Sequence, residues 1–425
     1  MGLVGILFVI LLAAGLPIAF VIGIASTPYF IIKGIPLEVV VQRMISSTQS
    51  FPLLAVPFFV FAGNLMNETG ITTRMIKFAN VLTGHMRGGL GQVNIVLSAL
   101  MGGVSGSAVA DCAMDCRMLG PIMMKKGYSK AFVAAVSAMS GLICATIPPS
   151  IGLVLYGVTG EVSIGRLFMA GIIPGIMMMF AMMIATVFIA KKRNYVRERE
   201  KPATVKEVLL GVKENFWALI FPFLLILGIR SGLFTPSEAG AFSVVYAFLV
   251  GTLIYRELTL QKLWEVLKQT AADIGVIMFI IACSAVFGYA VVTDRLPQYL
   301  SQYIIGISGN RYIIMFSIIG FLLIIGMFME STANVLILVP IFLPIIRALD
   351  FDPVHFGLIF MLVNTMGGMT PPVGTTMYAA CSLLECPTES YTVECLPYYA
   401  AVLVTVLIVV FFPDIVLFVP NLVFG

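Results

Sequence analysis

The sequence predicts an all-α polytopic membrane protein, made of two inverted repeats that each contain a re-entrant hairpin and a proline-broken helix. Of its 425 residues, 60% are hydrophobic and only 11% are charged, which is more apolar than a soluble surface allows. Several apolar runs exceed the roughly 20 residues that a bilayer-spanning helix needs. Two similar segments, "TIPPSIGLVLYG" and "MTPPVGTTMYAA", place adjacent prolines inside runs of membrane length.

The first repeat is predicted over residues 1–190. It opens with an apolar run, residues 1–32, which lacks the basic start and the small-residue cleavage site of a secretory signal. This run therefore predicts a retained transmembrane helix. Residues 71–86 mix charged with apolar side chains, so we expect either an amphipathic arm helix at the membrane interface or an ordinary surface connector.

A hairpin and a broken helix complete this repeat. Residues 89–123 have positively charged flanks at both ends, which predicts a hairpin that enters from the cytoplasm and returns there. Residues 130–158 are interrupted by Pro148 and Pro149, and each proline removes a helix hydrogen bond. We therefore expect a broken helix, followed by an unbroken one that ends near Ala190.

The segment between the repeats sets the orientation. Residues 191–206, "KKRNYVREREKPATVK", carry seven Lys or Arg against two Glu, so the positive-inside rule places them in the cytoplasm. Residues 191–235 are thus expected to form a cytoplasmic basic loop and a connecting helix.

The second repeat is predicted over residues 236–425, with the opposite orientation. We expect an arm helix at 293–308, a hairpin at 312–346 with both ends outside, and a broken helix at 354–384. A last helix is expected to cross outward over residues 398–419.

Equal spacings support the repeat. Pro121 and Pro148 are 27 residues apart, as are Pro344 and Pro371, and the two copies are offset by 223 residues. Inverted repeats with interrupted helices are typical of secondary transporters. Chance similarity between apolar segments is the alternative interpretation.

Both hairpin tips are small and polar. The first reads "GGVSGSAVAD" (102–111) and the second reads "MFMESTAN" (327–334). Hydroxyl and amide oxygens suit a hard monovalent cation, and the exposed ends of interrupted helices attract ions. The alternative is that small residues serve only close helix packing.

Few charges lie within the hairpins. Asp111, Asp115 and Arg117 occur in the first hairpin and Glu330 in the second, and an ionisable residue inside a membrane is a candidate functional residue. Asp111 and Glu330 lie close to the tips and are the stronger candidates. Asp115 and Arg117 lie nearer the cytoplasm, where a solvated or mutually paired role is equally expected.

Other function classes find less support in the sequence. The net charge of +4 comes from residues clustered in loops, which argues against nucleic-acid binding. Seven scattered cysteines and only two histidines indicate neither a disulfide framework nor a zinc site. We find no nucleophile, metal or nucleotide motif and therefore expect no enzyme. A channel stays an open alternative because channels use similar hairpins.

Five ordered motifs carry a family resemblance that covers essentially the whole chain. They are "SFPLLAVPFFVFAGNLMNETGIT", "RGGLGQVNIVLSALMGGVSGSAVAD", "IPPSIG", "FTPSEAGA" and "TPPVGTTMY". Together they resemble the large membrane subunit, the DctM-like M subunit, of tripartite ATP-independent periplasmic (TRAP) transporters.

This resemblance implies a Na⁺-coupled importer of a small organic anion, such as sialic acid, a C4-dicarboxylate or a related organic acid or sulfonate, in the bacterial inner membrane. It implies an elevator mechanism, in which a transport domain of hairpins and broken helices slides against a scaffold. It also implies two or more Na⁺ ions and two partners, a small four-helix membrane subunit and a periplasmic substrate-binding protein. A binding-protein-independent anion carrier or an ion channel is the alternative.

The resemblance further implies two Na⁺ sites, each between one tip and the break of the same repeat. Val373 stands where Ser150 stands in the first copy, so the two ion sites are not expected to be chemically identical. The Na⁺ ligands are expected among Ser105, Ser107, Thr146, Pro148, Glu330, Ser331, Thr332, Asn334, Thr370 and Gly374. The surroundings of the anion are expected to include Ser107, Asp111, Ser150, Gly152, Thr375 and Thr376.

Overall fold

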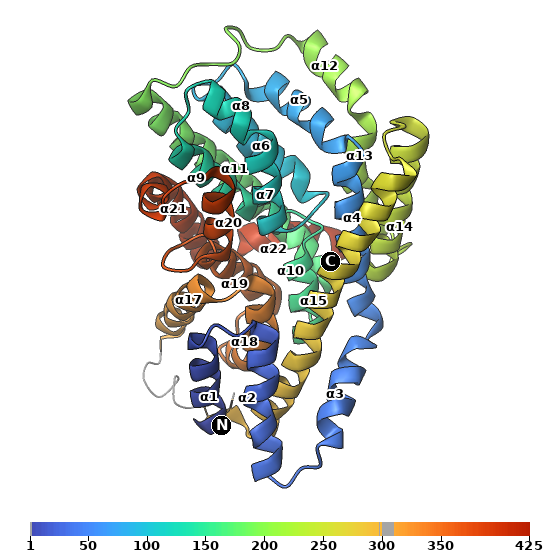
Figure 1. Ribbon diagram of the computed structural model, residues 1–425, viewed down its shortest axis with the longest axis vertical. Helices are drawn as coiled ribbons and strands as arrows, with labels where there is room; N and C mark the ends of the chain where they lie inside the picture. Colours follow the sequence, from blue (N-terminus) through green and yellow to red (C-terminus); the bar gives the residue numbers. More distant parts are fainter. Residues whose placement is uncertain (1, 297, 300–309) are drawn as a thin grey trace.

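The computed structural model describes residues 2–296, 298–299 and 310–425, and every regular element within these ranges is helical (Figure 1). Seven of the described helices are long and apolar enough to cross a membrane, or up to nine if each of two bent helix pairs is one span. The prediction of an all-α polytopic membrane protein is confirmed.

The N-terminal half contains a hairpin and a broken helix, preceded by shorter helices. Its elements are α1 (Gly2–Ala13), α2 (Ile18–Ile32), α3 (Glu38–Thr48), the 3-10 helix η1 (Phe51–Leu54), α4 (Ala55–Glu68), α5 (Ile71–Thr83), α6 (Gly89–Gly102), α7 (Ala108–Met118), α8 (Gly120–Lys125), α9 (Lys130–Thr146), α10 (Ile151–Gly160) and α11 (Ile164–Arg193).

The C-terminal half follows two linking helices. Most of the predicted arm helix at 293–308 lies outside the described residues. The elements are α12 (Val205–Glu214), α13 (Phe216–Arg230), α14 (Pro236–Leu249), the π-helix η2 (Val250–Ile254), α15 (Leu260–Thr293), α17 (Arg311–Phe328), α18 (Ser331–Ala348), α19 (Pro353–Gly367), α20 (Thr375–Leu384), α21 (Thr388–Phe411) and α22 (Pro413–Phe424).

The first apolar run differs from its prediction. Residues 1–32 form two helices, α1 and α2, instead of one transmembrane helix. Gly15 adopts a positive φ of 79°, a conformation that glycine takes without steric cost. Pro17 then precedes the first residue of α2, and a residue before proline is disfavoured in helical conformation. A hydropathy profile alone does not reveal the break at Gly15, Leu16 and Pro17.

Two further segments also divide at a break. The connecting helix predicted within 191–235 is a pair, α12 and α13, bent by 73°. Thr204 and Glu207 form a capping box that starts α12. The last helix, predicted over residues 398–419, ends at Phe411, and Pro413 starts a separate helix, α22.

The helix boundaries repeat along the chain. α7 starts at Ala108 and α18 starts 223 positions later at Ser331. The same offset separates the starts of α9 and α19, Lys130 and Pro353, and within one residue those of α6 and α17. Figure 1 shows α6 to α8 near the end of the molecule that carries α5 and α12, whereas α17 and α18 lie toward the end that carries α1 and α2. The hairpins thus come from opposite ends.

The helices form two groups. In one group α4 packs against α14 and α15, and α15 also packs against α2 and α3. In the other, α9 packs against α6, α7, α20 and α21, while α19 packs against α17 and α18. The groups meet where α15 contacts α18 and where α4 contacts α10, which is the region of both hairpin tips.

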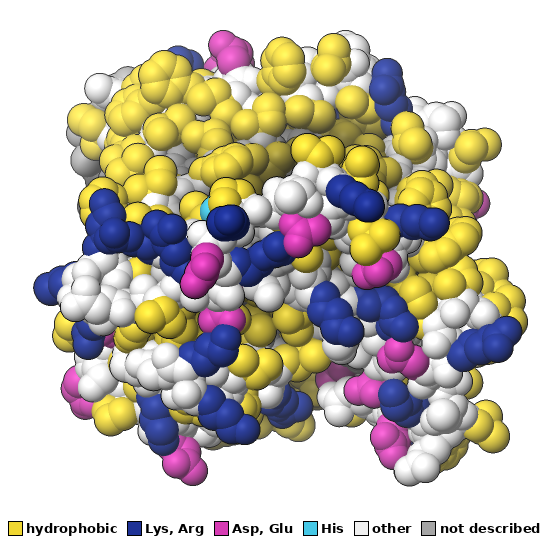
Figure 2. Space-filling model, turned by 90° about the horizontal axis from the view of Figure 1, so that it is seen from above, with side chains coloured by type: hydrophobic (Ala, Val, Ile, Leu, Met, Phe, Trp, Pro, Cys, Tyr) yellow, Lys and Arg dark blue, Asp and Glu magenta, His cyan; other side chains and the backbone are white. Residues whose placement is uncertain are grey.

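Basic side chains gather on the face that carries α5, α8 and α12 (Figure 2). The segment after α11 is tied to this face, because the backbone N–H of Glu198 donates to the carbonyl of Gly84 at 2.9 Å. Lys126 forms an ion pair with Glu198, and Arg193 forms one with Glu394. The basic segment therefore packs over the helix ends of the hairpin group.

Candidate functional site

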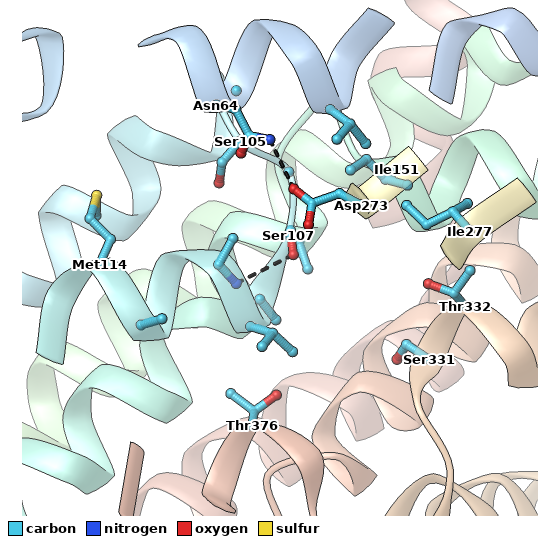
Figure 3. A pocket seen from close by; sticks show the side chains of 18 of the residues that line it. Asn64, Ser105, Ser107, Met114, Ile151, Asp273, Ile277, Ser331, Thr332 and Thr376 are labelled. Carbon is cyan, nitrogen blue, oxygen red and sulfur yellow. Dashed lines mark hydrogen bonds between the residues drawn. The ribbon is translucent and has the colours of Figure 1, made fainter. Parts of the chain in front are cut away.

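A cavity of about 1050 Å³ lies between the two helix groups (Figure 3). One wall comes from α4 and α15, and the other from both hairpin tips, α7, and the starts of α10 and α20. A single cavity therefore brings together two regions that are more than two hundred residues apart in the sequence.

The loop of the first tip, residues 103–107, reaches this cavity by lying directly on the first helix break. Gly106 has a positive φ of 59°, and a Cβ there would overlap the carbonyl oxygen of Pro149. Ser107 starts α7 by accepting a hydrogen bond from the N–H of Ala110 at 3.4 Å. Ser105 is buried, with its hydroxyl 3.1 Å from the thiol of Cys144. Only glycine allows the tip to approach the break this closely.

Two side chains at the first break make local hydrogen bonds. The hydroxyl of Thr146 donates to the carbonyl of Leu142 at 2.7 Å, and that of Ser150 accepts from the N–H of Leu153 at 3.3 Å. The peptide bond between Pro148 and Pro149 is cis. Both prolines lack an N–H, so the carbonyls four residues earlier lose their ordinary helical donor.

The second tip is built around a capping carboxylate. Glu330 starts α18 by accepting hydrogen bonds from the N–H of Thr332 at 2.7 Å and from its hydroxyl at 3.0 Å. The hydroxyl of Ser331 lies 3.3 Å from that of Thr365 on α19. The hydroxyl of Ser331 therefore faces α19, and Ser331 and Thr332 also line the cavity.

The second tip and the second break are joined by backbone contacts. The N–H of Gly374 donates to the carbonyl of Met327 at 2.7 Å. A Cβ on Gly367 would lie 2.6 Å from the Cα of Gly326, so α17 and α19 touch through their backbones. The hydroxyl of Thr370 donates to the carbonyl of Met366 at 2.8 Å. Both breaks thus contact the tip of their own repeat.

The predicted site residues divide into two sets. Those that line the cavity are Ser105, Ser107, Gly152, Glu330, Ser331, Thr332, Thr375 and Thr376. Those that do not line it are Asp111, Thr146, Pro148, Ser150, Asn334, Thr370 and Gly374.

Asp111 lies on the buried face of α7, together with Asp115. Its side chain is 1% exposed, and neither of its carboxyl oxygens has a hydrogen-bond partner among the described residues. Asp115 accepts a hydrogen bond from Ser98 at 3.2 Å. Neither aspartate borders the cavity, whereas Arg117, on the other face of α7, does.

The polar wall formed by α4 and α15 was not predicted from the sequence. Asn64 donates to Asp273 at 2.9 Å and to Thr270 at 3.2 Å, and Gln269 donates to Asp273 at 2.8 Å. Glu265, Gln269 and Asp273 recur at every fourth position of α15, which places them on one helix face. This spacing is the signal that was available in the sequence.

A second missed residue is Asn364, which lies behind the second tip. Its amide donates to the carbonyl and to the hydroxyl of Ser331, each at 3.2 Å. Its carbonyl oxygen accepts from Asn334 at 2.7 Å. Asn334 is fully buried, and its own oxygen has no partner among the described residues. Hydroxyl and amide oxygens therefore converge here.

The groups at the two tips are polar but do not form a transition-metal or disulfide site. Within the described residues, no group of three or more His, Cys, Asp or Glu could hold a metal ion. All seven cysteines are free and buried. The oxygens at the two tips come from hydroxyl, amide and carboxylate groups, which are ligands for hard cations.

Comparisons with known proteins identify the family of this chain. The family model for the DctM component of the tripartite ATP-independent periplasmic transporter matches residues 4–415. The sialic acid TRAP transporter large permease protein SiaM of Vibrio cholerae is 38% identical over 100% of this chain and 98% of its own length.

Two other relatives are named for different solutes. The 2,3-diketo-L-gulonate TRAP transporter large permease protein YiaN of Escherichia coli is 35% identical over 96% of this chain and 95% of its own. The C4-dicarboxylate TRAP transporter large permease protein DctM of Rhodobacter capsulatus is 33% identical over 98% of each chain.

These matches confirm the resemblance inferred from the five motifs. They also confirm that the protein is a transporter permease and not an enzyme, and that it is a multi-pass protein of the inner membrane. The chain belongs to the DctM family, the large membrane component of TRAP transporters.

Proposed function

We propose that this protein is a Na⁺-coupled importer that carries one small organic anion through the cavity between the two helix groups. The observation that carries this proposal is the meeting of both hairpin tips and the starts of α10 and α20 in one cavity of about 1050 Å³. A cavity of this size accommodates a small organic acid. Freed helix ends on the same wall supply groups that bind ions.

Two Na⁺ sites are proposed where each tip contacts its break. In the first repeat, Ser105, Ser107 and backbone carbonyls near Thr146 and Pro148 would surround the ion. The close approach of Gly106 to the carbonyl group of Pro149 supports this first ion site.

In the second repeat, the backbone link between Gly374 and Met327 supports a site of the same kind. It would draw on the hydroxyls of Ser331 and Thr332 and on the amide oxygen of Asn334. In both sites Na⁺ is cargo that moves with the substrate.

The anion is proposed to lie between these ions. Ser107, Gly152, Thr375 and Thr376 line the cavity between the tips. Asp111 and Ser150 do not border it and would act from behind, Asp111 within α7 and Ser150 as the cap of α10. A Na⁺ ion near each tip would lower the cost of placing an anion there, since opposite charges attract strongly in a partly dry site.

An elevator motion is proposed on the basis of the two helix groups. The group with α6 to α11 and α17 to α22 would slide as the transport domain along the scaffold of α2 to α4 and α13 to α15. The polar wall built on Asp273 faces the cavity from the scaffold side, so it offers a hydrated surface along which the tips can move.

The proposed partners are a periplasmic substrate-binding protein and a small four-helix membrane subunit. The relatives are named for sialic acid, 2,3-diketo-L-gulonate and C4-dicarboxylates. All of these are small organic acids, so the proposed substrate is a member of the same class. One relative, the isethionate TRAP transporter permease protein DctMQ of Oleidesulfovibrio alaskensis, is longer than this chain, which covers 65% of its length.

The test is uptake into proteoliposomes that contain this protein and its small subunit. Radiolabelled sialic acid, 2,3-diketogulonate, succinate and isethionate would be supplied with and without a cognate binding protein, under an inward Na⁺ or K⁺ gradient. Saturable uptake that requires Na⁺ and the binding protein supports the proposal. Uptake that needs neither indicates a simpler carrier, and a non-saturating ion current indicates a channel.

A first prediction concerns Thr332. Replacing Thr332 by Ala removes a hydroxyl at the second tip, so the Na⁺ concentration for half-maximal uptake should rise about tenfold, equivalent to about 1.4 kcal/mol. The measurement is the initial uptake rate as a function of Na⁺, with Ser107→Ala as the equivalent change at the first tip. Unchanged Na⁺ activation in both variants, at normal membrane expression, would contradict these ion sites.

A further inference from the structure

α7 presents two chemically different faces. Beyond Ala108 and Val109 in its first turn, the residues of α7 that line the cavity are Ala110, Ala113, Met114, Arg117 and Met118, and their spacing of three and four marks one face of a helix. The opposite face, which includes Asp111, Cys112, Asp115 and Cys116, is buried. The cavity face is thus small and apolar near the tip and ends in one guanidinium group.

Arg117 is the only Lys or Arg among the described residues that line the cavity. Its side chain is exposed, and within the described part of the chain no ion pair joins it to a carboxylate. A guanidinium group offers five N–H donors that match the geometry of a carboxylate. Arg117 therefore has its donors available to a solute in the cavity.

The opposite wall carries the opposite charge. Glu68 on α4 and Glu265 and Asp273 on α15 all line the cavity. Asp273 is held by N–H groups of Asn64 and Gln269. On the hairpin side, Glu330 also lines the cavity, but its carboxylate is held by Thr332 as the cap of α18. Away from that tip, an anion is repelled by the scaffold wall and attracted to Arg117 on α7.

Arg117 also lies at a defined depth. It is in the last turn of α7, ten residues from Ser107 at the tip, which corresponds to about 15 Å along a helix. The chain then continues into α8 and Lys126, which pairs with Glu198 of the basic segment. Arg117 is therefore at the end of the cavity nearer the basic face, well away from the tips.

We propose that Arg117 forms a separate carboxylate-binding station at the cytoplasmic mouth of the cavity, which takes a carboxylate of the organic anion as it leaves the inner site between the tips. This inference rests on the proposed function, because it requires an organic anion to cross the cavity. A basic residue in the last turn of a helix also interacts favourably with the helix dipole. That interaction is available on any face of α7, so it does not explain why Arg117 lies on the face toward the cavity.

The first experiment measures the local charge without any substrate. Met114→Cys places a thiol one turn before Arg117 on the same face. Its rates of reaction with anionic sulfonatoethyl methanethiosulfonate and cationic trimethylammonioethyl methanethiosulfonate are measured in the complete complex, and the rates of the native protein, whose cysteines are buried, are subtracted.

Adding Arg117→Gln should slow the anionic reagent and speed the cationic one by about threefold each, so their rate ratio falls about tenfold, as expected for unit charges about 6 Å apart in water. Arg117→Lys in the same background should keep the ratio. An unchanged ratio after Arg117→Gln would overturn the proposal.

The second experiment links the charge to transport. In the uptake assay with radiolabelled succinate, sialic acid and 2,3-diketogulonate, Arg117→Gln should raise KM for the transported anion about tenfold with little change in kcat, and Arg117→Lys should restore part of the loss. Lys125→Gln is the matched control, because Lys125 is exposed on α8 and does not line the cavity.

Equal KM values for Arg117→Gln and the native protein would overturn the proposal that Arg117 binds a carboxylate of the transported anion. Absence of uptake by the native protein would instead contradict the proposed function, and the reagent ratio would still report on Arg117.

Discussion

Replacing Gly106 by Ala is expected to reduce uptake at least a hundredfold while the protein still inserts in the membrane. Gly106 combines a positive φ of 59° with direct contact to the first break. An added Cβ would overlap the carbonyl oxygen of Pro149 and stand 3.1 Å from its carbonyl carbon. Backbone atoms cannot move aside as the end of a flexible side chain can, so the tip must separate from the break. The site that both elements form would then be lost.

Gly127→Ala provides the matched control. Gly127, in the turn before α9, also has a positive φ, of 86°, but a Cβ there would meet nothing within 4 Å. Both variants therefore bear the backbone cost of roughly 1 kcal/mol for a left-handed alanine, and only Gly106→Ala adds the collision. Uptake per unit of membrane-inserted protein is the measurement. Equal activity of the two variants would show that the contact between tip and break is not required.

Replacing Asn364 by Leu is expected to abolish Na⁺ activation and to destabilise the second tip. Asn364 is buried and holds Ser331 and Asn334 through three hydrogen bonds of 2.7 to 3.2 Å. Leucine has a similar volume but cannot pair with these groups. Leaving buried partners unsatisfied costs about 1–3 kcal/mol for each group, so the polar tip should no longer keep one conformation.

The measurements for Asn364→Leu are the thermal stability of the purified protein with and without Na⁺, and the Na⁺ dependence of uptake. The native protein should be stabilised by Na⁺ because a ligand that binds the folded state raises its stability, and the variant should lose this gain. Asn421→Leu is the control, since Asn421 bonds Arg166 at an exposed position. A normal Na⁺ response in Asn364→Leu would remove the second tip from the ion site.

The sequence was informative wherever local chemistry decides the structure. Adjacent prolines end α9 before Ser150, and glycine and serine mark the first tip, because these residues restrict or free the backbone whatever surrounds them. The equal offset of the helix starts follows from the same local signals. The break at Gly15 and Pro17 has local signals of the same kind, but the hydropathy of the apolar run around it predicts one continuous helix.

Side-chain directions could not be predicted in the same way. Asp111 and Arg117 lie on the same short helix, and which of them borders the cavity depends on how α7 packs against α9 and α20. The part of the polar wall on α15 was not predicted, because Glu265, Gln269 and Asp273 precede the most apolar part of that helix. They resemble the polar end of a transmembrane helix at the membrane interface. Tertiary contacts between distant segments, as at Asn364, leave no periodic pattern in one sequence.

We propose that the anion and Na⁺ move together through the cavity. The most direct test measures the flux of radiolabelled anion and of ²²Na⁺ in the same proteoliposomes, with the small subunit and the binding protein present. We predict a fixed ratio of Na⁺ to anion that is the same at every substrate concentration, and loss of both fluxes in Gly106→Ala. Anion uptake without accompanying Na⁺, or a Na⁺ flux that does not change with substrate, would contradict it.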